Sequence, residues 1–82
     1  MMYNYSEWKN YKNVPRFVKE YARWKINNLT DNKYLNAEWV DNTIGRIFDT
    51  VKRLEYGFIS IDESISVIEC GAFNADTDNE EE

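Results

Sequence analysis

Histidine is absent from this chain of 82 residues, and cysteine, proline and glycine are scarce. Without histidine, the chain lacks the commonest general base and the commonest metal ligand of proteins. Cys70 is the single cysteine, which excludes an internal disulfide framework and a cysteine-clustered zinc site. Asp62 and Glu63 are adjacent, and neighbouring helix residues point in different directions, so they do not form a catalytic carboxylate pair. We therefore expect no enzyme, no cofactor and no bound metal ion.

Long apolar runs are also missing. No stretch approaches the ~20 apolar residues that span a bilayer. Residues 1–5 lack the basic-then-apolar pattern of a secretory signal. We expect a cytoplasmic protein, in the host cell if a phage encodes it, with no membrane partner. A chain of this length buries about 64% of its unfolded surface, which suffices for one small core.

Charge is distributed unevenly along the chain. Residues 1–33 hold seven basic and three acidic residues, and residues 34–75 hold three basic and seven acidic residues. Residues 76–82 add five more carboxylates and no basic residue. The chain thus has a basic front, an acidic back and an acidic end, an asymmetry that can steer charged partners. We expect one helical domain over residues 1–73 and a flexible acidic tail over residues 74–82, because the tail is too polar to bury itself.

Helical spacing of apolar residues dominates the chain. A helix over residues 15–29 is predicted to begin at Pro15 and to turn one face to the core. That face would carry Phe17, Val18, Tyr21, Trp24 and then either Asn28 or Leu29. A stronger stripe predicts a second helix between Asn36 as N-cap and Gly57 as C-cap. Its core residues would be Val40, Ile44, Ile47, Val51 and Leu54, widened by Trp39 and Phe48.

A third helix is predicted over residues 61–70. Ser60 and Glu63 have the spacing of a capping box, and Ile61, Ile65 and Ile68 would face the core. Near the N-terminus, Ser6 can cap a turn or two. Gly45 inside the second helix indicates close packing of a neighbour. The sequence thus predicts an all-α fold, a compact three-helix bundle with a short N-terminal fourth helix as an open option.

Basic and aromatic residues interleave in the first part of the chain. On one continuous helix, Lys9, Lys12, Arg16, Lys19 and Arg23 would share a sector of about 80°, although Pro15 should break such a helix. Aromatic residues make up 16% of the chain, more than a core of this size can hide. Exposed rings beside arginine are typical of interface hot spots. The candidate partner-binding residues are Trp8, Tyr11, Arg16, Lys19 and Arg23. The acidic back around Asp41, Asp49 and Glu55 is the next surface to test.

Ten asparagines, an aromatic N-terminal segment, residues 54–63 and the acidic end together give the chain a recognisable character. In this it resembles small accessory proteins of phages and mobile elements, which include anti-CRISPR and other anti-defence proteins. The resemblance concerns the whole chain, so it assigns no role to a single residue.

Three functions remain open. The leading hypothesis is a non-enzymatic protein-binding module, a phage-type inhibitor that occludes a host nucleic-acid-processing protein such as a CRISPR effector. The first alternative is a small nucleic-acid-binding regulatory protein that uses the basic N-terminal half, although the acidic tail would compete for that surface. The second is a self-associating virion or assembly component, for instance a homodimer.

Overall fold

A computed structural model of the protein describes residues 5–70. Regular structure in this range is entirely helical: the 3₁₀-helix η1 (Ser6–Asn10), α1 (Arg16–Asp31), α2 (Ala37–Glu55) and an α-helix over residues 61–70. The predicted all-α three-helix bundle is confirmed, and η1 takes the place of the short fourth helix. The segment expected to form the acidic tail, residues 74–82, lies outside the described residues.

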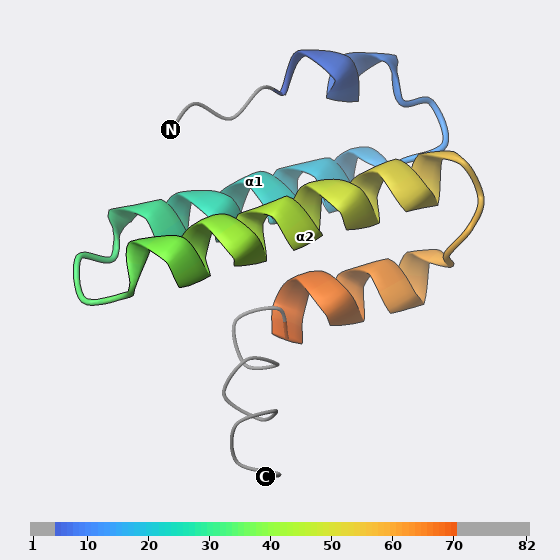
Figure 1. Ribbon diagram of the computed structural model, residues 1–82. Helices are drawn as coiled ribbons and strands as arrows, with labels where there is room; N and C mark the ends of the chain where they lie inside the picture. The colour runs from blue at the N-terminus through green and yellow to red at the C-terminus, as the bar shows by residue number, and fades with distance from the viewer. Residues whose placement is uncertain (1–4, 71–82) are drawn as a thin grey trace, which may run out of the picture.

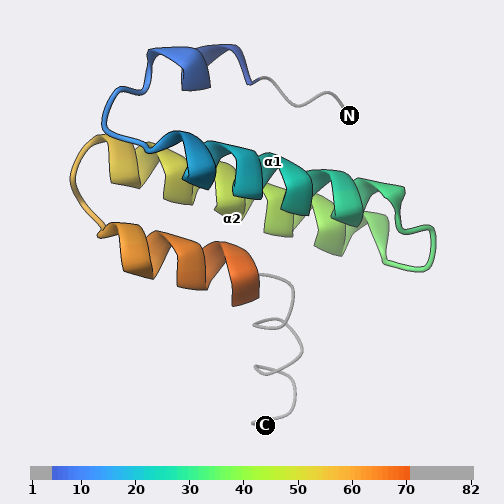
Figure 2. The same ribbon diagram turned by 180° about the vertical axis from the view of Figure 1, so that it is seen from behind.

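α1 and α2 form an antiparallel pair at the centre of the fold. Figures 1 and 2 show η1 on one side of this pair and the helix of residues 61–70 on the other. At the end where α1 begins, the Asn13 backbone N–H donates to Glu55 Oε1 at 2.8 Å, and Asn13 Nδ2 donates to the Glu55 carbonyl at 2.8 Å. These two bonds fix the chain entering α1 against the last turn of α2.

The core contribution of α2 follows its sequence pattern. All five residues of the predicted stripe are buried: Val40, Ile44, Ile47, Val51 and Leu54. Trp39 and Phe48 are partly buried beside them, as predicted. Ile68 of the third helix is fully buried, Ile65 is half-buried, and Ile61 is 39% exposed at the start of that helix.

The face that α1 turns to the core matches the sequence prediction only in part, at Val18 and Leu29. Its buried residues are Val18, Ala22, Ile26 and Leu29. Phe17 and Trp24 are instead 56% and 59% exposed, and half-buried Tyr21 stacks on Trp24 with ring centroids 6.0 Å apart. The prediction was wrong for Phe17 and Trp24, because small and branched side chains at steps of four let the helices pack closely. Trp8 of η1 supplies the large ring of the core instead.

Side-chain caps begin two of the helices. Asn36 Oδ1 accepts a hydrogen bond from the Trp39 backbone N–H at 3.0 Å, which confirms the predicted N-cap of α2. Ser60 Oγ accepts from the Glu63 backbone N–H at 3.1 Å. The Glu63 carboxylate accepts from the Ser60 hydroxyl, with 3.4 Å from Ser60 Oγ to Glu63 Oε1, in place of the Ser60 backbone N–H that it accepts from in a complete capping box.

Gly57 and Gly45 have different roles. Gly57 has φ +79°, and the N–H groups of Gly57 and Phe58 bond the Leu54 and Arg53 carbonyls at 3.1 and 2.9 Å. This is the Schellman arrangement, in which a left-handed residue closes a helix, and it confirms the predicted end of α2. The expected close neighbour at Gly45 is absent, since a Cβ added there would meet no heavy atom within 4 Å. That prediction was wrong because Gly45 lies on the exposed side of α2.

Candidate functional site

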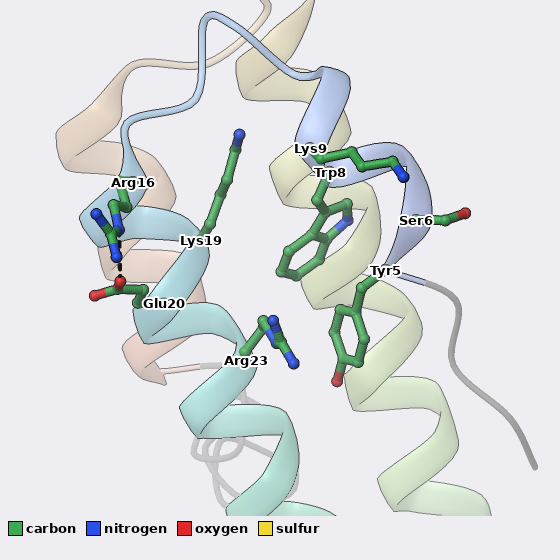
Figure 3. A pocket seen from close by; sticks show the side chains of 8 residues that line it. All are labelled: Tyr5, Ser6, Trp8, Lys9, Arg16, Lys19, Glu20 and Arg23. Carbon is green, nitrogen blue, oxygen red and sulfur yellow. Dashed lines mark hydrogen bonds and ion pairs between the residues drawn. The ribbon is translucent and has the colours of Figure 1, made fainter.

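A groove of about 500 Å³ opens between η1 and α1 (Figure 3). Its lining holds four basic residues and one acidic residue. We call it the basic groove, and it is formed by Tyr5, Ser6, Trp8, Lys9, Arg16, Lys19, Glu20 and Arg23. Both helices are required, because residues 5–9 form one wall and residues 16–23 form the other.

Aromatic packing holds the η1 wall in place. The rings of Tyr5 and Trp8 meet edge to face, with centroids 5.0 Å apart and planes at 79°. Both rings also contact Phe48 of α2, at 5.4 Å from Tyr5 and 5.1 Å from Trp8. Trp8 is only 4% exposed and belongs to the hydrophobic core. This three-ring cluster anchors η1 to α2 and gives the groove a fixed floor.

Arg23 reaches from α1 to the opposite wall. Its guanidinium carbon lies 4.8 Å from the centroid of the Tyr5 ring, within cation–π distance. Burial raises the pKa of Tyr5, and the charge of Arg23 opposes that shift. The Tyr5 hydroxyl is therefore neutral at physiological pH, and its ring positions a guanidinium whose N–H groups remain free to bind an anion.

The charges of the groove are incompletely balanced. Arg16 Nε pairs with Glu20 Oε2 at 2.9 Å, and these side chains are 90% and 64% exposed. Figure 3 places this pair on the side of the groove away from η1. No carboxylate of residues 5–70 pairs with Lys9, Lys19 or Arg23. Three cations are thus available to an anionic ligand.

The structure unites four of the five predicted partner-binding residues. Arg16, Lys19 and Arg23 line the groove from α1, and Trp8 lines it from η1. Trp8 is nevertheless a core residue, so the expectation of an exposed ring at this position needs correction. Tyr11 lies outside the groove, and its hydroxyl donates to Glu7 Oε1 at 3.2 Å. Desolvation and the Glu7 carboxylate raise the pKa of Tyr11.

Sequence reasoning missed Tyr5. The spacing of three between Tyr5 and Trp8, which brings two side chains together in a helical turn, was the available signal. As expected from Pro15, Lys9 does not share a helix with the later basic residues. η1 ends at Asn10 and α1 begins at Arg16, so Lys9 reaches the groove from the other wall. Lys12 lies between η1 and α1 and does not line the groove.

The acidic back offers fewer free carboxylates than the sequence suggested. Asp49 Oδ2 pairs with Arg53 Nε at 2.9 Å. Glu55 holds Asn13, and Asp41 also interacts within the chain. Cys70 is exposed at the end of the described range. Within that range, we find no group of three potential metal ligands and no helix with the length and apolar character needed to cross a membrane.

Comparisons of the chain with protein families, with curated proteins and with solved structures each find no match.

Proposed function

We propose that this chain is a non-enzymatic protein-binding module whose basic groove takes a carboxylate-bearing segment of a protein partner. The observation that carries the proposal is the set of three cations, Lys9, Lys19 and Arg23, that line one groove with an aromatic floor and have no carboxylate partner within residues 5–70. Arginine presents a planar fork that matches a carboxylate, and Tyr5 holds this fork in place before binding.

The covered faces of the two aromatic rings in the groove favour an acidic peptide over a nucleic acid as its ligand. Proteins that track single strands combine basic residues with open aromatic faces on which bases stack. In the groove, Trp8 is buried and the Tyr5 ring is covered by Arg23. Neither ring presents an open face to a base, so the stacking contribution of about 1–3 kcal/mol per base is not available there.

The resemblance to phage accessory proteins suggests the class of partner. We propose an anti-CRISPR-like inhibitor that occludes a host nucleic-acid-processing protein in the cytoplasm. Metal-dependent nucleases hold their ions with clustered carboxylates. A groove with three unpaired cations is complementary to such a cluster and can cover it without any catalysis.

The test is capture of partners by the full chain, compared between two matched charge-reversal variants. The groove variant is R16E/K19E/R23E. The control K33E/R46E/K52E changes the net charge equally, at exposed positions outside the groove. Bound protein and nucleic acid are identified by mass spectrometry and sequencing, and the affinity of the identified partner is then measured. Circular dichroism verifies that both variants remain helical.

We expect the groove variant to lose about 2 kcal/mol of binding free energy, a factor of about 30, and the control to lose little. Equal losses in both variants would contradict the groove as the binding site. Binding to bare nucleic acid that weakens steeply between about 50 and 500 mM salt would instead support the nucleic-acid alternative.

A further inference from the structure

The carboxylates that the basic groove lacks are present elsewhere in the chain. Residues 5–70 contain ten basic and ten acidic residues, yet Lys9, Lys19 and Arg23 find no carboxylate among them. Residues 76–82 carry five carboxylates in seven positions and no basic residue. We call residues 76–82 the acidic segment. Its chemistry is that of the ligand proposed for the groove.

We propose that the acidic segment docks into the basic groove of its own chain and competes there with the partner. This inference rests on the proposed function, because it assumes that the groove binds carboxylates. It adds a regulatory step, because a partner must displace the acidic segment before the partner can bind in the groove.

The reach of the segment is comparable to the dimensions of the described part of the molecule. An extended chain spans at most about 3.6 Å per residue, so Asp76 can lie about 20 Å from residue 70 and Glu82 about 40 Å. The described part of the molecule measures 37 × 28 × 16 Å. Residues 61–70 and η1 lie on opposite sides of the α1–α2 pair (Figures 1 and 2), and a chain of this length can pass around the pair.

The groove favours partial, reversible docking of the segment. Exposed ion pairs are individually weak and screened by salt. Attachment to the same chain, however, gives the segment an effective concentration of the order of 1 mM. A segment that binds with a dissociation constant near this concentration occupies the groove about half of the time. Competition of this strength lowers the apparent affinity for a carboxylate ligand by a factor of about 2 at low salt.

The experiment compares the full chain with the neutralised variant D76N/D78N/E80Q/E81Q/E82Q, which keeps the length and removes only charge. Nuclear magnetic resonance is recorded at about 50 mM salt, where the Debye length is roughly 14 Å, and again at about 500 mM. The reporters are the Arg23 Nε–H and Trp8 indole N–H signals at the groove, with the Lys52 backbone amide as a distant control. We expect neutralisation to shift both groove signals at low salt and to leave them unchanged at high salt.

Three outcomes would overturn the inference. In the first, the groove signals would not respond to neutralisation. In the second, the Lys52 amide would respond as strongly as the groove signals. In the third, the response would grow with protein concentration, which would indicate docking between two copies. The same neutralisation in the R16E/K19E/R23E background should have no effect on the Trp8 signal. A response that persists in that background would also contradict docking in the groove.

A second titration separates this inference from the proposed function. The neutralised variant receives a synthetic peptide of residues 76–82 as a free carboxylate probe. We expect the peptide to bind about twice as tightly to this variant as to the full chain. Binding of equal strength to both proteins overturns docking in the same chain but leaves the groove as a carboxylate site. Absence of binding to both overturns the groove as a carboxylate site and the inference with it.

Discussion

At the scale of single residues, Asn13 and Glu55 show what a sequence does not reveal. They are 42 positions apart, and two hydrogen bonds of 2.8 Å join them. The sequence placed Glu55 on a free acidic surface, since no local pattern announces a contact of this range. Tyr5 escaped attention for the same reason, because its role depends on Phe48 of α2 and Arg23 of α1. Lys19 and Arg23 were identified because their charge is visible in the sequence itself.

Three tyrosines give a prediction about alkaline stability. Desolvation raises the pKa of Tyr5, Tyr11 and Tyr21 above the ordinary value of 10.0. The folded state therefore holds these protons more tightly than the unfolded state, so their contribution to stability is complete below pH 10 and is lost above it. Urea denaturation at about pH 8 and pH 11, on either side of the tyrosine pKa, should show a loss of stability in the wild-type protein.

The matched variant is Y5F/Y11F/Y21F, which removes the three titrations and keeps every lysine. We expect it to lose less stability than the wild type between the two pH values. Equal losses would show that other groups, such as lysines with an ordinary pKa of about 10.4, cause the alkaline effect.

At the scale of the elements, the sequence was accurate where one stripe of branched residues decides the face. The core of α2 and both of its ends were predicted because its apolar residues, its N-cap and its terminal glycine agree. α1 has two competing stripes, an aromatic one and one of small and branched residues. The fold buries the second, in which Ala22 allows close packing. Hydrophobicity alone ranks the larger rings higher, so the orientation of α1 could not be predicted without knowing that Trp8 of η1 fills the core.

Gly45 inside α2 and Gly57 at its C-terminal end should have opposite effects on stability when they are replaced by alanine. Gly45 lies inside α2 with open space around it, so Gly45→Ala should stabilise the protein by about 0.5–1 kcal/mol. Gly57 has φ +79°, which disfavours a side chain, so Gly57→Ala should destabilise it by about 1–2 kcal/mol. Thermal unfolding followed by circular dichroism measures both. A destabilised Gly45→Ala protein would contradict this expectation and would support the close packing at Gly45 that the sequence predicted.

At the scale of the whole molecule, the charge asymmetry of the sequence becomes a spatial arrangement. The basic residues 9, 19 and 23 gather in one groove, while Asp49 and Glu55 of the acidic back are engaged by Arg53 and Asn13. The cations are therefore the less satisfied of the two sets. This difference depends on contacts between helices, and it leaves the groove as the surface with the most unpaired charge.

Deletion of residues 74–82 tests how this asymmetry contributes to stability. A segment with five carboxylates has little apolar surface to bury, so its removal should leave the bundle intact. Docking for half of the time stabilises the folded state by about 0.4 kcal/mol, the value of RT ln 2. For a domain of this size that corresponds to a fall in Tm of about 2–3 °C on deletion. The fall should vanish at about 500 mM salt, because screening abolishes the docking in both proteins. A fall of more than about 8 °C at both salt concentrations would exceed what exposed ion pairs supply, and it would assign these residues to the packed fold.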